Sequence, residues 1–108
     1  MNDTLSKLYQ VVEDRRSHPQ EGSYTCYLFD KGLDKILKKV GEECTETVIA
    51  AKNGVQADTV GEISDLIYHL MVMMVQQGIP LQAVMDELEV RSHKIGNLKQ
   101  FHVSDHNT

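Results

Sequence analysis

Two helical segments joined by a short link restrict the fold of this chain more than any other feature of its sequence. Residues 33–52 and residues 59–77 each place apolar side chains at the three- and four-residue spacing of an α-helix. The pair Asn53-Gly54, between them, is typical of a helix C-terminus. Because a short link makes consecutive helices antiparallel neighbours, the two segments are predicted to form a helical hairpin.

Each segment of this hairpin carries a group of acidic residues. The first group is Glu42, Glu43 and Glu46, and the second is Glu62 and Asp65. Residues three apart lie about 60° apart around a helix, so Glu43 and Glu46 share a face, which Glu42 borders. Glu62 and Asp65 share a face in the same way. In an antiparallel hairpin the two acidic faces can meet.

Such a meeting of carboxylates indicates a metal site. Gathered carboxylates repel one another unless protons or cations neutralise them. Oxygen ligands without Cys or His suit Mg²⁺ or Mn²⁺, and Mg²⁺ held by a few carboxylates commonly takes substrate phosphates at its open positions. The pattern therefore indicates a Mg²⁺-dependent enzyme that acts on a phosphorylated small molecule.

A solvated charged face is the structural alternative. Lys38 precedes Glu42 by four residues, and Lys39 precedes Glu43 by four, so ion pairs along the helix explain part of the charge. Lys39 either counters a substrate phosphate or pairs with Glu43. The spacing alone does not separate the two readings.

The rest of the chain is predicted to be helical as well. Residues 4–16 have helical periodicity, Ser23 can cap a short helix through Phe29, and Pro80 suits the start of a helix that ends near Lys94. Asp58 or Thr59 is the predicted cap of the second hairpin helix. The fold class is therefore all-α, an antiparallel bundle of about four main helices.

The apolar positions of the hairpin helices predict how they pack. The stripe predicted for residues 33–52, with the acids on its polar flank, consists of Leu33, Ile36, Leu37, Val40, Cys44, Val48 and Ala51. The stripe predicted for residues 59–77 consists of Val60, Ile63, Ile67, Leu70, Met71 and Met74. His69 is interpreted as a hydrogen-bonded core histidine. Between Leu66 and Val75 this helix is apolar nearly all round, so a second subunit is expected to cover it, in a homodimer or higher even oligomer.

Composition narrows the class of protein. The length of 108 residues indicates one domain, with residues 1–97 as the helical domain and residues 98–108 as a polar tail. A net charge of −5 argues against nucleic-acid or anionic-membrane partners. No signal peptide is evident, and no apolar run is long enough to cross a bilayer. Two cysteines without a framework of pairs fit a reducing cytosol, so a cytoplasmic location is expected.

A family resemblance joins these observations. The motif Glu-Glu-x-x-Glu is followed on the next helix by Glu-x-x-Asp, within GSYTCYLFDKGLDKILKKVGEECTETVIAAKN at residues 22–53 and EISDLIYHLMVMM at residues 62–74. This pattern resembles the all-α nucleoside triphosphate pyrophosphohydrolases of the MazG-like superfamily. Over residues 5–91 the chain is similar to the phosphoribosyl-ATP pyrophosphohydrolase family of histidine biosynthesis, to which Ser-Tyr-Thr before Lys31-Gly32 points.

The resemblance implies hydrolysis of phosphoribosyl-ATP to phosphoribosyl-AMP and pyrophosphate, with Mg²⁺ or Mn²⁺ as cofactor. It implies that the metal is held by Glu43, Glu46, Glu62 and Asp65. It places Glu42 at the edge of the site, where it orients or deprotonates water, and makes Glu43 and Glu46 part of the catalytic group. The residues it implies for substrate binding are Ser23, Tyr24, Lys35, Lys38, Lys39, Arg91 and Lys94.

Two other functions stay open on the sequence. One is a house-cleaning pyrophosphohydrolase that uses the same metal site on ordinary or damaged nucleoside triphosphates. The other is a non-enzymatic helical dimerisation module whose acids are solvated. The second alternative predicts that Mg²⁺ does not stabilise the protein.

Overall fold

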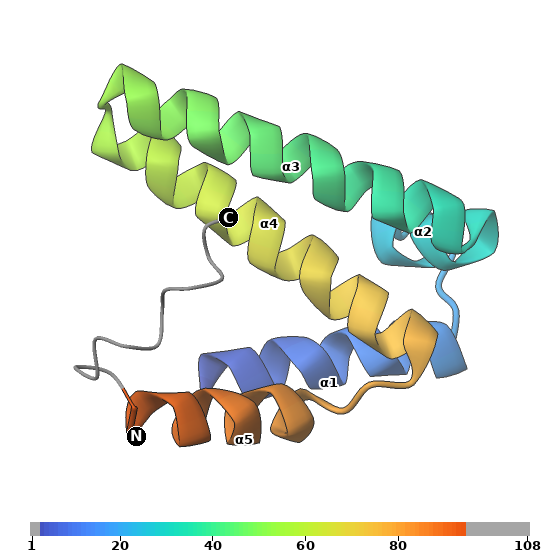
Figure 1. Cartoon of the computed structure of the whole chain (residues 1–108). Helices are drawn as coiled ribbons and strands as arrows, with labels where there is room; N and C mark the ends of the chain where they lie inside the picture. Colours follow the sequence, from blue (N-terminus) through green and yellow to red (C-terminus); the bar gives the residue numbers. More distant parts are fainter. Residues whose placement is uncertain (1–2, 95–108) are drawn as a thin grey trace.

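A computed structural model describes residues 3–94, and their secondary structure is α-helical, as predicted (Figure 1). The predicted tail at residues 98–108 lies outside the described residues. The helices are α1 (Thr4–Ser17), α2 (Tyr24–Lys31), α3 (Leu33–Asn53), α4 (Gln56–Gln77) and α5 (Leu81–Ser92). Among them none is both long and apolar enough to span a membrane.

The predicted hairpin is formed by α3 and α4, which run alongside each other in Figure 1. Gly54 ends α3 in the left-handed conformation, with φ of 80°, and its amide donates to the carbonyls of Ala50 and Ala51 at 3.2 Å. Glycine adopts this conformation without a steric penalty, which explains the sharp end of the helix. Two residues, Gly54 and Val55, then join the helices.

The predicted start of α4 is wrong by three residues. The helix begins at Gln56, and Val55 occupies the N-cap position without a side-chain cap bond. The carbonyl of Val55 instead accepts from the amides of Asp58 and Thr59, both at 3.1 Å. Asp58 therefore lies inside the first turn, where its charge favours the positive end of the helix dipole.

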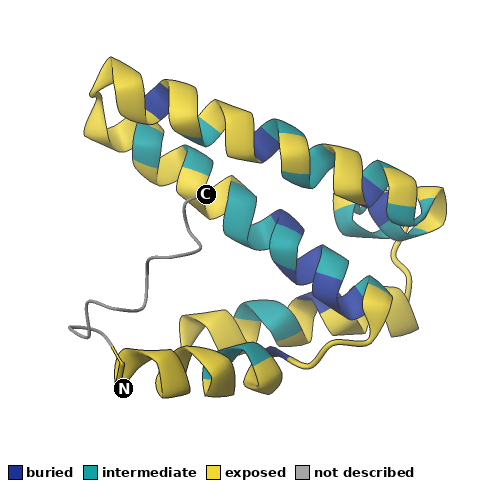
Figure 2. Ribbon diagram, in the orientation of Figure 1, coloured by how far each residue is buried: buried dark blue, intermediate teal, exposed yellow. Residues whose placement is uncertain are grey.

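The hydrophobic core lies where the C-terminal half of α4 crosses α1 and α2 (Figure 2). Its buried members are Val12, Leu28, Ile36, Met71, Val72, Met74, Val75 and Leu81. Four of these belong to the part of α4 that is apolar nearly all round. That part is thus covered largely within the protomer, and Val72, which is fully buried, belongs to the core.

Only part of the predicted apolar stripe of α3 is buried, and Ile36 is its member in the core. The residues that α3 buries are Ile36, Glu43 and Ala50, which recur every seven residues and so share a face. Leu37, Cys44 and Ala51, one residue further on, are exposed, and Val48 is 68% exposed. The predicted polar flank is therefore wrong for Glu43, which is buried, whereas Glu46 is exposed.

The apolar stripe of α4 is only half buried. Met71 and Met74 are in the core, whereas Val60 and Ile63, nearer the hairpin link, are exposed. Figure 2 shows that the half of the hairpin near the link is exposed on most of its surface. Within α4, the exposed apolar residues thus lie nearer the link and not between Leu66 and Val75.

Candidate functional site

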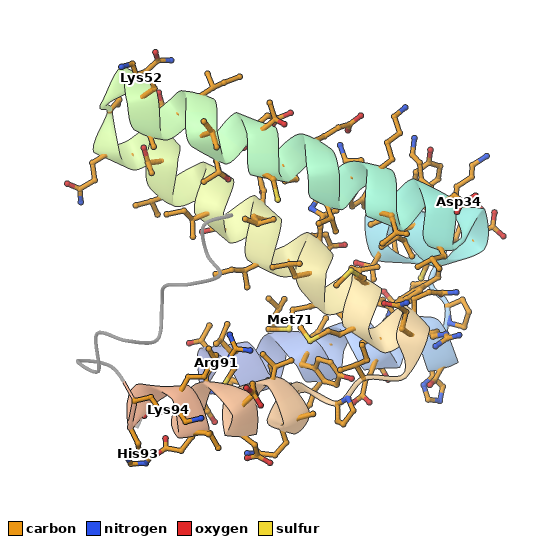
Figure 3. The ribbon with its side chains drawn as sticks, in the orientation of Figure 1. Asp34, Lys52, Met71, Arg91, His93 and Lys94 are labelled. Carbon is orange, nitrogen blue, oxygen red and sulfur yellow. The ribbon has the colours of Figure 1, made fainter. Side chains whose placement is uncertain are left out.

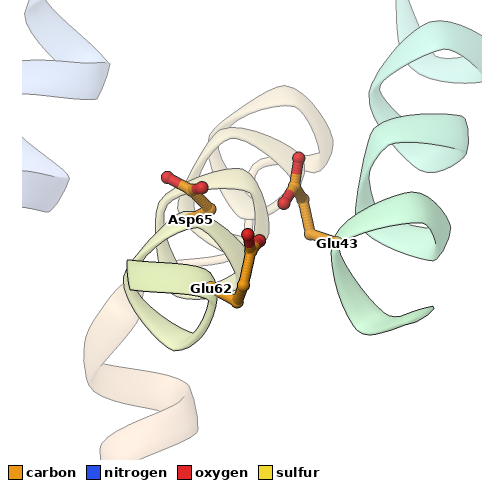
Figure 4. Close-up of side chains that lie close together, drawn as sticks. All are labelled: Glu43, Glu62 and Asp65. Atoms are coloured by element: carbon orange, nitrogen blue, oxygen red, sulfur yellow. The ribbon is translucent and has the colours of Figure 1, made fainter. Parts of the chain in front are cut away.

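The two acidic groups meet across the hairpin, as the sequence predicts. Glu43 on α3 and Glu62 and Asp65 on α4 each offer a carboxylate oxygen, and these three oxygens lie within 4.8 Å of one another (Figure 4). Glu43 is only 5% exposed, Glu62 is half-buried and Asp65 is exposed. The cluster therefore has a buried floor on α3 and an open side at Asp65.

The cluster has the electrostatics of a cation site. Within the described part of the chain, the Oε1 atoms of Glu43 and Glu62 are buried and have no hydrogen-bond partner. Burial raises the pKa of Glu62, and the nearby carboxylates of Glu46, Asp65 and Glu43 raise it further. A buried carboxylate oxygen without a partner is costly, and a divalent cation would supply the partner and cancel the repulsion. An all-oxygen donor set fits Mg²⁺ or Mn²⁺.

Thr47 joins the two helices beside the cluster. Its Oγ1 lies 2.7 Å from the carbonyl oxygen of Glu43 and 3.3 Å from that of Glu62. The hydroxyl can share its single hydrogen between the two carbonyls in a three-centre bond, which links the backbones of two acidic residues. Thr47 is not among the residues predicted from the sequence, although it lies one turn after Glu43 and therefore on the same face of α3.

Glu46 lies at the open side of the cluster. It is exposed, and together with Glu62 and Asp65 it lines a cavity of about 440 Å³. The structure thus places Glu46 next to the group of three without making it one of the closely spaced carboxylates. Its role as a metal ligand stays a prediction.

Lys39 forms an ion-pair network at the edge of the cluster. Its Nζ lies 3.1 Å from Glu42 Oε1 and 3.6 Å from Glu43 Oε2. The hydrogen bond between Lys39 and Glu42 raises the pKa of the lysine and lowers the pKa of the glutamate. Lys38 is a weaker partner of Glu42, at 3.9 Å. The ion pairs predicted along α3 are thus present together with the carboxylate cluster.

Tyr24 reaches the same site from α2. Its hydroxyl lies 3.0 Å from His69 Nε2. Burial raises the pKa of Tyr24, while the charge of Lys39 lowers it and that of Glu43 raises it, so the phenol lies within electrostatic range of both. Ser23 has a structural role beside it, because its Oγ accepts from the Cys26 amide at 3.2 Å and caps α2.

The remaining predicted substrate residues are spread over two parts of the fold. Lys35 lies on α3 with its Nζ 6.0 Å from the centre of the Tyr27 ring. Arg91, whose Nε donates to Glu87 at 2.9 Å, and Lys94 lie at the end of α5, in the layer of α1 (Figure 3). One protomer therefore gathers Tyr24, Lys35 and Lys39 near the acids but keeps Arg91 and Lys94 apart.

The helical hairpin and its carboxylate cluster agree with the resemblance to the all-α nucleoside triphosphate pyrophosphohydrolases of the MazG-like superfamily. Known proteins narrow this class further. The family described as phosphoribosyl-ATP pyrophosphohydrolase matches residues 5–92, and the chain belongs to this family.

Relatives match along nearly their whole length. A phosphoribosyl-ATP pyrophosphatase of Clostridium acetobutylicum is 54% identical over 99 residues, which are 92% of this chain and 90% of that protein. One of Listeria monocytogenes serotype 4b is 55% identical over 95 residues, which are 88% of this chain and 91% of that protein. The family resemblance read from the sequence is thus confirmed.

Proposed function

We propose that this chain hydrolyses phosphoribosyl-ATP to phosphoribosyl-AMP and pyrophosphate in histidine biosynthesis, in the cytoplasm. Family membership over residues 5–92 and relatives named for this activity support the proposal. The structural observation that carries it is the meeting of Glu43, Glu62 and Asp65 between α3 and α4. These acids come from the Glu-Glu-x-x-Glu and Glu-x-x-Asp motifs on which the family resemblance was based.

Glu43, Glu62 and Asp65 would hold Mg²⁺, or Mn²⁺ in its place, and Glu46 would complete the ligand set from the open side. The ion would polarise the phosphoryl oxygens and lower the pKa of the attacking water. The protein's own contribution is positional. Thr47 ties the backbones of Glu43 and Glu62 together, and burial of the Glu43 carboxylate keeps water from screening its charge.

Glu42 would orient the attacking water from the edge of the site. Its bond to Lys39 lowers its pKa, so the carboxylate stays ionised but is a weak base. An ionised carboxylate at the edge of the site accepts hydrogen bonds from water, and this fixes where the water lies. Lys39 stays charged for the same reason and supplies positive charge for the substrate phosphates.

Lys35, Lys38, Ser23 and Tyr24 extend the substrate site from the acids toward α2. Arg91 and Lys94 can join it only if α5 of a second subunit brings them there, because they lie in the other layer of their own protomer. The homodimer, or a higher even oligomer, also explains the exposed apolar surface near the hairpin link. This surface includes Val48, Ile49, Val60 and Ile63.

Pyrophosphate release from phosphoribosyl-ATP, measured with Mg²⁺ and then after chelation, tests the proposal. We expect Mg²⁺-dependent turnover in the wild type and almost none in Asp65→Asn, which removes one anionic ligand at similar volume. Full activity after exhaustive chelation would refute the metal assignment. Equal kcat/KM for ATP and phosphoribosyl-ATP would support the house-cleaning alternative, and no turnover of either, with no effect of Mg²⁺ on Tm, would support the dimerisation module.

A further inference from the structure

His69 connects α4, the helix that carries Glu62 and Asp65, to α2. It is 4% exposed and lies on α4, one turn after Asp65. Its Nδ1 is 2.7 Å from the carbonyl oxygen of Asp65, and its Nε2 is 3.0 Å from the hydroxyl of Tyr24. Both ring nitrogens thus form hydrogen bonds, one to a residue of α4 and one to a residue of α2. This confirms the interpretation of His69 as a hydrogen-bonded core histidine.

The partners determine the tautomer of this imidazole. A carbonyl oxygen can only accept, so Nδ1 carries the hydrogen and donates to Asp65. In the neutral ring Nε2 is then an acceptor, and the Tyr24 hydroxyl donates to it. The bond to Asp65 therefore orients the ring so that its acceptor faces Tyr24.

Ring packing strengthens this arrangement. The ring centres of Tyr24 and His69 are 5.8 Å apart in an edge-to-face contact, and those of Tyr68 and His69 are 4.9 Å apart. Such contacts favour one orientation of the imidazole. Tyr68 also shares a hydrogen bond with Thr25, so two successive residues of α4 bind two successive residues of α2.

The side of Tyr24 that His69 leaves free can face a substrate. Tyr24 remains 45% exposed and stacks on Tyr27, with ring centres 6.0 Å apart, and Lys35 lies beside Tyr27. Aromatic faces beside ammonium groups suit a ligand that combines a purine with phosphates. This pair of rings borders the site that contains Lys39 and Glu43.

We infer that His69 is a positioning residue for substrate binding, which holds the Tyr24 ring at the edge of the carboxylate site through its hydrogen bond to the phenol. The inference rests on the proposed function. His69 contacts the metal site only through the backbone carbonyl of Asp65 and does not touch the reacting phosphate, so its loss is expected to act chiefly through Tyr24. Losing one hydrogen bond of this kind is expected to raise KM for phosphoribosyl-ATP about 2- to 10-fold, with little change in kcat.

Two amide replacements separate the two bonds of His69. His69→Gln places an amide oxygen near the position of Nε2, so it can still accept from Tyr24. His69→Asn keeps a donor near the position of Nδ1 but is too short to reach the phenol. We expect His69→Gln to keep KM near the wild-type value and His69→Asn to raise it as much as Tyr24→Phe does. The double variant His69→Asn/Tyr24→Phe should be no worse than either single variant.

Tyr68→Phe is the matched control. It removes the hydrogen bond between Tyr68 and Thr25 but keeps the ring that packs on His69 and Tyr24, and it is expected to lower Tm while leaving KM unchanged. Equal KM increases in Tyr68→Phe and His69→Asn would overturn the inference, because general loosening of α2 would then explain both. Additive effects of Tyr24→Phe and His69→Asn would overturn it too.

Failure of the proposed function has a different signature. A wild-type protein that releases no pyrophosphate from phosphoribosyl-ATP would refute the function and, with it, this inference. Normal wild-type turnover combined with an unchanged KM in a folded His69→Asn would refute the inference alone. Tm and circular dichroism of each variant establish that it is folded.

Discussion

At the scale of single residues, Glu62 shows how the proposed cation site would oppose folding when no cation is bound. Its pKa in the folded protein is raised above the ordinary 4.5 by burial and by neighbouring acids. The folded protein therefore binds more protons than the unfolded chain at pH values between these two pKa values. By linkage, stability falls as the pH rises through this window and then levels off.

Glu62→Gln should therefore stabilise the metal-free protein, because it removes this repulsion at nearly constant volume. The gain should be absent below pH 4.5, where the carboxyl is protonated in both states, and should grow as the pH rises through the folded-state pKa. Thermal unfolding of the wild type and the variant, in the presence of a chelator and at a series of pH values, measures this gain in stability. Glu87→Gln, on the exposed surface of α5, is the control and should give no such gain. A Glu62→Gln advantage that does not depend on pH would contradict the repulsion argument.

Spacing along the chain could predict the acids of the site but not their hydrogen-bonded neighbours. Glu43, Glu62 and Asp65 follow from helical periodicity and a short link. The contacts of Thr47 with Glu62, and of Tyr24 with His69, join different helices. These contacts depend on how far each helix is rotated about its own axis. The spacing of apolar residues predicts that rotation only to within about one residue, or about 100°.

At the scale of helices, α3 shows the consequence of that uncertainty. A face containing Leu37, Cys44 and Val48 is the more apolar choice, yet α3 buries Ile36, Glu43 and Ala50. The two faces differ by one residue, or about 100°. A count of apolar residues favours the exposed face of α3, because such a count assumes that a carboxylate such as that of Glu43 is never buried. Helix bounds were easier to predict, since glycines end α2, α3 and α4.

The end of α3 gives a test at this scale. Gly54→Ala should destabilise the protein by about 1–2 kcal/mol, because alanine disfavours the positive φ of 80° that the turn requires. Gly41→Ala is the matched control within the same helix. It should stabilise by about 0.5–1 kcal/mol through helix propensity, since an added Cβ meets nothing within 4 Å. Denaturant unfolding of both variants measures the difference, and equal effects would contradict the assigned backbone geometry.

At the scale of the whole molecule, the exposed apolar residues near the hairpin link predict self-association. Val48→Glu should weaken it, because a carboxylate buried in an interface is costly to desolvate. Sedimentation at micromolar concentration is expected to show a dimer or larger even oligomer for the wild type and a shift toward monomer for the variant. Val11→Glu, at a comparably exposed position on α1, should leave assembly unchanged. A wild type that sediments only as monomer would refute the oligomer.

The short link between α3 and α4 also has a consequence for the order of folding. Gly54 and Val55 close the smallest loop between long helices of this chain's described part, so the hairpin costs little chain entropy to form. Contacts between residues that are close in sequence tend to form before contacts between residues that are far apart in sequence. The contacts between α1 and α4 are of the second kind. The acids would then be brought together early, and their repulsion would act on the folding barrier. Mg²⁺ is therefore expected to accelerate refolding in stopped-flow experiments more than it slows unfolding.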